Sequence, residues 1–325
     1  MILKRPEAYH GQSYRRPFFE GWYHKMSSKD GNLFVIIPGI YRSGINNNQT
    51  AFIMFYQGSS GRVDYIPYNV SDFQCDGNSY KLRLGNSYFS LERIILDFEN
   101  EHLNVKGEIS TSNLNPWPVS LIERGCMGWY GYIPTMECFH GILSMNHNLN
   151  GQLNVNEKQI ELDGGFGYIE KDWGKNFPKD WVWAQSNNFN ESGLSISASL
   201  ATIPWKNYEF SGFIVGIQHQ QKLYKFTTYN FSKILKIKFK NDTLFWVIKK
   251  GNLELEIKIK IGNKSGLLYA PDKTDMIPKV EEYLDGELSF KLKRNKKIIL
   301  ENFSNQTAVE IVGKTDKLIN NAIKG

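Results

Sequence analysis

Hydrophobic and polar residues alternate with a period of two in many short runs along this chain, and Gly, Asn, Asp and Ser separate the runs. The runs in the first half are 33–37, 51–56, 79–84, 88–91 and 102–109, and those in the second half are 195–200, 213–218, 223–229, 233–240, 244–249, 253–261, 288–292 and 297–301. Helical periodicity is confined to short pieces at 277–284 and 316–323. The pattern therefore predicts an all-β protein.

The number and spacing of these strands are typical of antiparallel barrels or sandwiches. A chain of 325 residues exceeds the usual size of a single core, so we expect two such domains in tandem, 1–164 and 165–325. Each half opens on a tryptophan-bearing strand, Gly21-Trp22-Tyr23 in the first and Trp181-Val182-Trp183 in the second. A Gly-Trp element in the first strand is common in calycin-type barrels, which enclose one small apolar ligand.

Composition narrows the class of protein further. Aromatic residues make up 14% of the chain, which is high for a soluble protein and predicts rings that line cores or a cavity. The net charge of +6 is spread along the chain and no recognition motif accompanies it, which argues against nucleic acid and leaves contact with an anionic membrane surface open. The start lacks the apolar segment of a signal peptide, and no run of about 18 apolar residues occurs, so we expect a cytoplasmic protein.

The residues 167–185 hold three tryptophans, two glycines, a proline and three carboxylates. An extended chain sets two groups on opposite faces: Tyr168, Glu170 and Asp172 on one, and Ile169, Lys171 and Trp173 on the other. Two carboxylates on the same face lie within about 7 Å of each other. If that face is buried, desolvation and repulsion raise the pKa of one of them and leave a protonated acid; if it faces water, both are ordinary anions.

Two further strands carry candidate chemistry. Trp181, Trp183, Gln185 and Asn187 share one face, where core packing explains the indoles but not the amides, because buried amides need partners. Near the start, Glu20, Trp22 and His24 share a face, with Phe19 and Tyr23 opposite. This second group is either the rim of a pocket, or a barrel plug in which Glu20 pairs with Arg15 or Arg16.

Other chemistries lack support in the sequence. The six histidines show neither His-x-His nor His-x-x-x-His spacing, and the three cysteines, at 75, 126 and 138, lack Cys-x-x-Cys spacing, so we expect no metal site and three free thiols. Neither a Gly-x-Ser-x-Gly elbow nor a phosphate-binding glycine loop is present.

Several segments together resemble the tocopherol cyclase family. They are Arg16-Pro17-Phe18-Phe19-Glu20-Gly21-Trp22-Tyr23, Met127-Gly128-Trp129-Tyr130-Gly131, the spaced run from Glu170 to Asn187, Leu268-Tyr269-Ala270-Pro271, Tyr283-x-x-Gly286-Glu287-Leu288 and Ala308-Val309-Glu310-Ile311. The likeness spans nearly the whole chain in order.

The resemblance implies two lipocalin-like β domains that close a prenylated hydroquinone to a chromanol, with no redox cofactor or metal. Such chemistry needs a shielded acid that protonates an alkene and aromatic walls that tolerate the resulting cation. The candidate acids are Glu170 and Asp172, then Glu20 and Glu137. The residues expected to bind the lipophilic substrate are Trp22, Tyr23, Glu137, Trp173, Trp181, Trp183, Gln185 and Asn187.

Departures from the family pattern shift these expectations. The plant pattern has Asn at the position of Asp172, which favours Glu170 as the acid. The run Glu137-Cys138-Phe139-His140 differs from a Glu-Pro-His-Trp-like run, and a one-residue shift reverses the face of a strand residue, which argues against a role for His140. Two other functions remain open: a carrier that binds an isoprenoid without chemistry, and a hydratase that adds water to an isoprenoid alkene. The substrate and the oligomeric state are left open.

Overall fold

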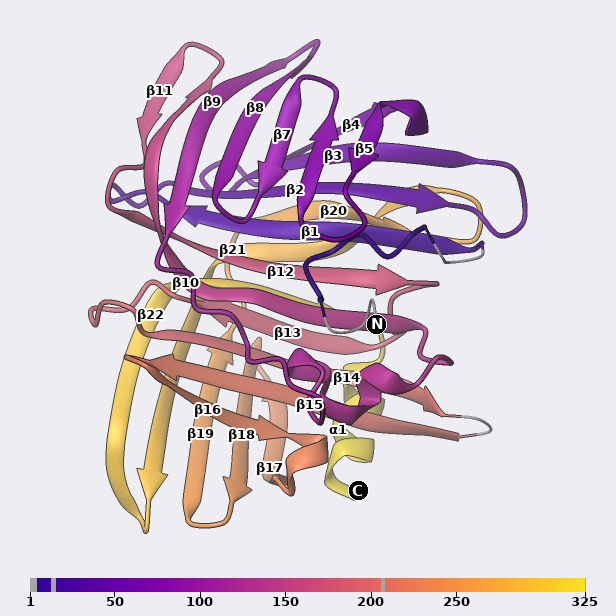
Figure 1. The fold of residues 1–325 in the computed structure, drawn as a ribbon. Helices are drawn as coiled ribbons and strands as arrows, with labels where there is room; N and C mark the ends of the chain where they lie inside the picture. Colours follow the sequence, from indigo (N-terminus) through magenta and orange to yellow (C-terminus); the bar gives the residue numbers. More distant parts are fainter. Residues whose placement is uncertain (1–4, 13–15, 206–207, 325) are drawn as a thin grey trace. The chain divides into compact units, whose positions relative to one another are not determined.

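The computed structural model describes residues 5–12, 16–205 and 208–324, and these fold into two large antiparallel sheets (Figure 1). The first sheet has the strand order β4 (Arg62–Tyr68), β3 (Gln49–Gln57), β2 (Leu33–Arg42), β1 (Phe18–Ser27), β12 (Gly165–Gly174), β10 (Cys138–Val155), β9 (Leu103–Ser112), β8 (Arg93–Asn100), β7 (Ser87–Ser90), β6 (Lys81–Leu84) and β5 (Phe73–Cys75), and β11 (Lys158–Glu161) pairs with β10.

The second sheet has the strand order β16 (Lys222–Thr227), β15 (Tyr208–His219), β14 (Ser195–Trp205), β13 (Trp181–Ser186), β22 (Lys297–Val312), β21 (Met276–Arg294), β19 (Leu253–Lys260), β18 (Thr243–Lys250) and β17 (Lys233–Lys240), and β20 (Ser265–Pro271) pairs with β21. The helix α1 (Thr315–Lys324) and the 3-10 turns η2 (Val70–Asp72), η3 (Gly125–Tyr132) and η4 (Thr228–Asn230) complete the described elements.

The all-β expectation with antiparallel sheets is confirmed, and so is the helix expected at 316–323. The helix expected at 277–284 is wrong, because these residues lie within β21. Val280, Glu282 and Leu284 are buried at every second position, which is the period of a strand with one covered face. Glu282 is the residue that hides this period in the sequence, because a carboxylate stands where an apolar side chain is expected.

The described residues form two compact units. The first ends at Phe177 and also contains Leu267–Lys279, and the second contains Pro178–Gly266 and the residues from Val280 onward. The boundary predicted from the sequence is 164/165, whereas β12 begins at Gly165 and forms hydrogen bonds to β1 and β10 in the first sheet. Segment 165–174 thus belongs with the first unit.

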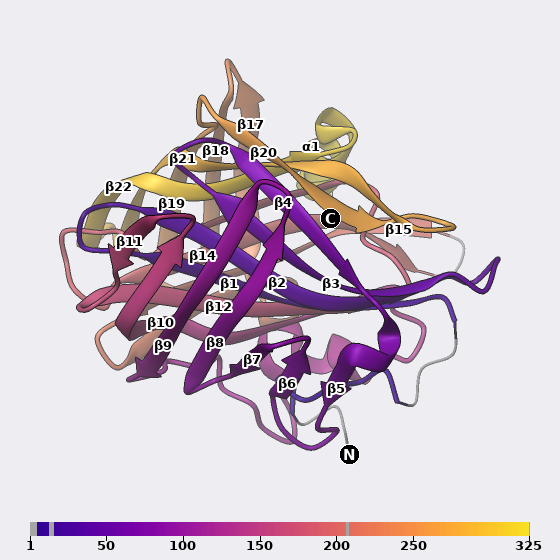
Figure 2. The same cartoon turned by 90° about the horizontal axis from the view of Figure 1, so that it is seen from above.

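The core of the first unit lies between two parts of one bent sheet. Figure 2 shows β8 and β9 crossing over β1, β2 and β3 at a large angle. Aromatic rings meet between the two parts, with centroids 6.5 Å apart for Trp22 and Phe73 and 5.9 Å apart for Phe55 and Phe98. The face of β1 that carries Trp22 therefore points into this core.

The second unit has a core of its own. Alternate residues of β13, Val182 and Ala184, join it, and Phe213 meets Trp246 edge to face at 5.9 Å. The helix α1 adds Leu318, Ile319 and Ala322 to the core. Trp181, Trp183 and Gln185 alternate with Val182 and Ala184, so their side chains lie on the other face of β13.

Candidate functional site

Three neighbouring strands of the first unit, β1, β12 and β10, carry most of the candidate residues. Cross-strand partners share a face, and the register pairs Glu20 with Trp173 and Trp22 with Lys171. It also pairs Asp172 with His140 across β10. The predicted alternation along β1 and β12 is confirmed, and the two faces of these strands form two different polar clusters.

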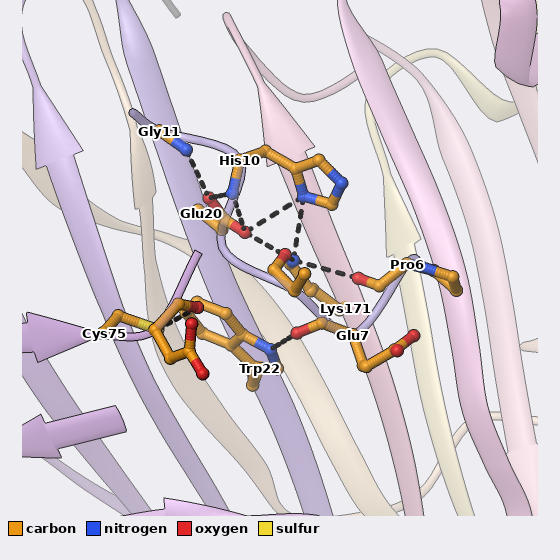
Figure 3. A network of polar contacts seen from close by, with 10 residues as sticks. Pro6, Glu7, His10, Gly11, Glu20, Trp22, Cys75 and Lys171 are labelled. Atoms are coloured by element: carbon orange, nitrogen blue, oxygen red, sulfur yellow. Dashed lines mark hydrogen bonds and ion pairs between the residues drawn. The ribbon is translucent and has the colours of Figure 1, made fainter. Parts of the chain in front are cut away.

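On the first face, Glu20 and Lys171 form an ion pair with both side chains fully buried. The carboxylate of Glu20 accepts hydrogen bonds from the backbone N–H groups of His10, at 3.1 and 3.0 Å, and of Gly11, at 3.2 Å (Figure 3). Burial alone would raise the pKa of Glu20, but the charge of Lys171 and the hydrogen bonding by His10 outweigh it and hold that pKa below its usual value. Glu20 therefore stays ionised and suits a structural anion better than a proton donor.

Lys171 occupies the space between two of the predicted cage tryptophans. Its ammonium lies 4.6 Å from the centroid of the Trp22 ring and 4.9 Å from that of Trp173. Burial lowers the pKa of Lys171, and the Glu20 carboxylate opposes that shift. The indoles that the sequence suggested as walls for a substrate cation thus hold a cation of the protein itself.

The N-terminal residues complete this first cluster. The Lys171 ammonium donates to the carbonyl oxygens of Pro6, at 2.9 Å, and Ala8, and the indole N–H of Trp22 donates to the carbonyl of Glu7 at 3.1 Å. The His10 ring stacks on Trp173 with centroids 4.3 Å apart. Residues 6–11 are thereby fastened onto β1 and β12. Arg15, one of the two predicted partners of Glu20, lies outside the described residues, and Arg16 bonds Asn46 and Gln49 instead.

His24, which the sequence placed on the same face as Glu20, is also interior. Its Nε2 lies 2.7 Å from the hydroxyl of Tyr80, and His147 is buried as well, with Nδ1 3.1 Å from the hydroxyl of Ser144. Burial lowers the pKa of each imidazole to about 3, with a smaller contribution from His147 in the case of His24. Both rings are therefore neutral at ordinary pH and belong to the packing of the first unit.

On the opposite face, four residues form what we call the acid cluster: His140, Tyr168, Glu170 and Asp172. The imidazole of His140 lies between the two carboxylates, with Nδ1 3.0 Å from Oδ1 of Asp172 and Nε2 3.7 Å from Oε2 of Glu170. The hydroxyl of Tyr168 donates to the same Oε2 of Glu170. A hydroxyl, a carboxyl, an imidazole and a second carboxyl thus follow one another, and the gap of 3.7 Å between the imidazole and Glu170 is one that a single water can bridge.

The cluster is partly accessible. The Asp172 side chain is 24% exposed, His140 is 15% exposed and Glu170 is 7% exposed. Tyr23 is the cross-strand partner of Glu170 and is also largely buried, so its ring stands beside the carboxyl on the same face. A ligand on this face would meet acid–base groups next to aromatic surface.

Three residues of the acid cluster, His140, Glu170 and Asp172, are chemically able to hold a metal ion. In the described part of the chain, one ligand atom each of His140, Glu170 and Asp172 lie within 4.8 Å of one another. One imidazole and two carboxylates suit a divalent transition metal. The spacing of histidines along the sequence gave no hint of this grouping, because the register of β10 against β12 creates it.

The remaining candidates lie elsewhere. Glu137 is exposed just before β10, where its carbonyl oxygen accepts the backbone N–H of Lys175 at 2.7 Å. In the second unit, Trp181 donates its indole N–H to Glu310 at 2.7 Å, and Glu310 is the cross-strand partner of Trp183. Gln185 and Asn187 are buried. Their predicted role in substrate binding stays a prediction.

The sequence pattern does not predict the position of His140 beside the two carboxylates, nor the ion pair between Lys171 and Glu20. The alternation along β12 places Lys171 on the same face as Trp173, but only the strand register makes Glu20 its diagonal neighbour across β1. For His140, the register places the imidazole directly across from Asp172.

Fold and site together define an all-β protein of two antiparallel sheets that presents a His–carboxylate cluster on one sheet face. The sequence model of the tocopherol cyclase-like family matches residues 95–313, and the chain belongs to that family. Among curated relatives, it is 23% identical to a protein of Oryza sativa subsp. japonica described as a probable chloroplastic tocopherol cyclase, over 96% of this chain and 79% of that protein. A chloroplastic tocopherol cyclase of Zea mays is 22% identical, over 96% of this chain and 78% of that protein.

Among solved structures, that of CghA with Sch210972 matches with a TM-score of 0.59 at 11% identity, covering 92% of this chain and 89% of that one. At this identity the likeness concerns the fold alone. No helix among the described residues combines the length and apolar character that crossing a bilayer requires.

Proposed function

We propose that this protein is an acid–base catalyst that closes a prenylated hydroquinone, or a similar isoprenoid phenol, to a chromanol. The observation that supports it most is the His140 imidazole held between the carboxylates of Asp172 and Glu170, with Tyr168 on Glu170. Membership of the tocopherol cyclase-like family supports the reaction class.

The proposed reaction begins at Glu170. Its carboxylic acid gives a proton to the less substituted carbon of the prenyl alkene, so that a C–H bond forms and a tertiary cation remains on the neighbouring carbon. Tyr23 and Tyr168 are aromatic residues next to Glu170 on this face, and their rings would stabilise the developing charge. Each such contact stabilises a desolvated cation by roughly 0.5–2 kcal/mol.

Ring closure follows when the phenol oxygen bonds to the cationic carbon. The phenolic proton leaves to His140, whose imidazolium form is stabilised by Asp172 at 3.0 Å. From His140 the proton returns through one bridging water to Glu170, whose Oε2 lies 3.7 Å from Nε2, and this transfer restores the acid. Substrate and product are isomers, and the proton balance closes without any other reactant.

Turnover by variants tests this proposal. Purified protein incubated with a prenylated hydroquinone is expected to yield a chromanol of unchanged mass, measured by liquid chromatography and mass spectrometry. Glu170→Gln is expected to lower the rate about 10²- to 10⁴-fold, because general acid–base catalysis contributes that much. Glu157→Gln removes an exposed carboxylate in a turn and serves as the matched control.

Three outcomes would contradict the proposal or part of it. Binding of the hydroquinone without conversion would favour the carrier function, and a product heavier by one water would favour the hydratase. Equal rates for Glu170→Gln and the unchanged protein would remove Glu170 from the mechanism.

A further inference from the structure

A pocket of about 670 Å³ in the first unit is lined by residues of β2 and of β5–β7, and both faces of the β5–β7 strands contribute to it. Arg42 of β2, Lys81 and Arg83 of β6 and Tyr88 of β7 contribute to its walls, together with Tyr9 and Phe73. Its size lies within the range of pockets for small organic molecules, roughly 300–1,000 Å³. Neither the family assignment nor the proposed reaction gives this pocket a role.

The register separates the pocket from the acid cluster. Ile40 lines the pocket and is the cross-strand partner of Glu20, which in turn pairs with Trp173. These side chains share one face, whereas Asp172, the neighbour of Trp173 in β12, points to the other face. A molecule in the pocket is thus on the opposite side of the sheet from His140 and its carboxylates.

The charges around the pocket favour an anion. Among the residues that the structure describes, three cationic side chains line it, against a single carboxylate, Asp76. Asp76 already accepts the backbone N–H of Asn78 at 2.9 Å and the hydroxyl of Ser79 at 2.7 Å, and these two bonds lower its pKa. Asp76 stays ionised and offsets part of the charge of Lys81, so the described lining keeps an excess of cationic over anionic side chains.

Aromatic rings accompany the cations. The rings of Tyr9 and Phe73 lie 5.2 Å apart, and the guanidinium of Arg83 lies 5.4 Å from the centroid of Tyr88. Arg42 donates to the hydroxyl of Tyr9 at 2.9 Å, and burial raises the pKa of Tyr9 to about 12, so this hydroxyl adds no negative charge. Guanidinium groups beside ring faces recognise a flat apolar group joined to an oxyanion.

We propose that this pocket is a second ligand site that binds an amphipathic anion, an aromatic ring carrying a carboxylate or a phosphate. The ring packs against Tyr9 and Phe73, and the oxyanion contacts Lys81, Arg83 and the remaining donors of Arg42. The site is independent of the proposed cyclisation.

Binding of three matched probes to the full chain tests the proposal: 2-naphthoate, 2-naphthyl phosphate and neutral 2-naphthol, measured by titration calorimetry. At least one anion is expected to bind about tenfold or more tightly than 2-naphthol, because a charge-assisted hydrogen bond is about twice as strong as a neutral one. The better anion of the two assigns the natural oxyanion to a carboxylate or to a phosphate ester.

Variants locate the binding. The double variant Lys81→Gln/Arg83→Gln alters two exposed side chains and is expected to weaken anion binding about tenfold or more, whereas Lys158→Gln, an exposed lysine of β11, leaves it unchanged. Glu170→Gln also leaves it unchanged, which separates this site from the acid cluster. Anions that bind no better than 2-naphthol, or equally well to the double variant, would overturn the proposal.

Discussion

Lys171 and Glu20 form an ion pair inside the first unit, with neither side chain exposed to solvent. The pair does not stand alone, because Lys171 also donates to carbonyl oxygens of residues 6 and 8, and Glu20 accepts N–H groups of residues 10 and 11. Isolated buried ion pairs often contribute little, since desolvation offsets their attraction. Here the pair fastens an N-terminal segment onto two central strands.

Removing one partner is expected to be costly. Lys171→Met keeps most of the side-chain volume but leaves the Glu20 carboxylate buried without its cation, and we expect a loss of about 3–5 kcal/mol in the free energy of unfolding. Urea denaturation followed by tryptophan fluorescence measures it. Lys158→Met, on the surface of the same unit, should stay within about 0.5 kcal/mol of the unchanged protein.

The double variant Glu20→Gln/Lys171→Met provides the second half of the test. Because it removes both charges, its loss should be clearly smaller than the sum of the two single losses. Additive losses would mean that the two side chains are not energetically coupled.

Acid should destabilise the protein well before its carboxylates titrate. The pKa values of His24 and His147 fall from 6.5 to about 3 on folding. Between these pH values the unfolded chain therefore binds protons at both histidines, whereas the folded protein does not. Above pH 6.5 both histidines are neutral in the folded and the unfolded protein, and the free energy of unfolding has its full value. It falls as the pH decreases toward 3, and at pH 5 the loss is about 2 kcal/mol per histidine. Denaturant midpoints from pH 8 to pH 5 measure the slope.

A single variant measures the contribution of His24 to this pH dependence of stability. His24→Asn should flatten the dependence between pH 6.5 and pH 5 by about half, whereas His102→Asn, at an exposed position, should leave it unchanged. A slope that His24→Asn does not alter would contradict the assignment. The lowered pKa of Glu20 acts in the same direction, but only below its ordinary value of 4.5.

Asp172 is expected to act through His140. Asp172→Asn should lower the rate of cyclisation roughly 10- to 100-fold, because it removes a hydrogen bond to a charged group worth about 1.5–3 kcal/mol. The effect should fall on kcat rather than KM. In the background of His140→Asn, the same change should cost nothing further, and a full additional loss would show that Asp172 acts on the substrate directly.

Zinc is expected to inhibit the reaction. His140, Glu170 and Asp172 bring ligand atoms within 4.8 Å of one another, so Zn²⁺ should bind them and withdraw all three from proton transfer. Activity measured with micromolar zinc should fall and return on addition of EDTA, and His140→Asn should weaken zinc binding measured by calorimetry. Loss of activity on EDTA treatment alone would instead indicate a metal that takes part in the reaction.

Much of the fold followed from alternation alone, because one-sided burial imposes a period of two on a strand. The prediction failed at 277–284, where Glu282 is buried in a strand position and breaks the apolar pattern. For the site, the faces of β1 and β12 were predictable from local spacing. The pairing of Lys171 with Glu20, and of His140 with Asp172, joins segments about 150 and 30 residues apart. The register that brings these segments together depends on the pairing of strands throughout the sheet, and a local sequence pattern does not specify that pairing.

Deuterium incorporation tests the proposed function most directly. In D₂O, the protein with a prenylated hydroquinone should form a chromanol that carries one deuterium. The deuterium should lie on the former alkene carbon that is adjacent to the carbon bonded to the ring oxygen, because the acid delivers its proton there. Glu170→Gln should slow this incorporation by the same factor as cyclisation. A chromanol without deuterium at that carbon, or no conversion under conditions where the hydroquinone binds, would contradict the account.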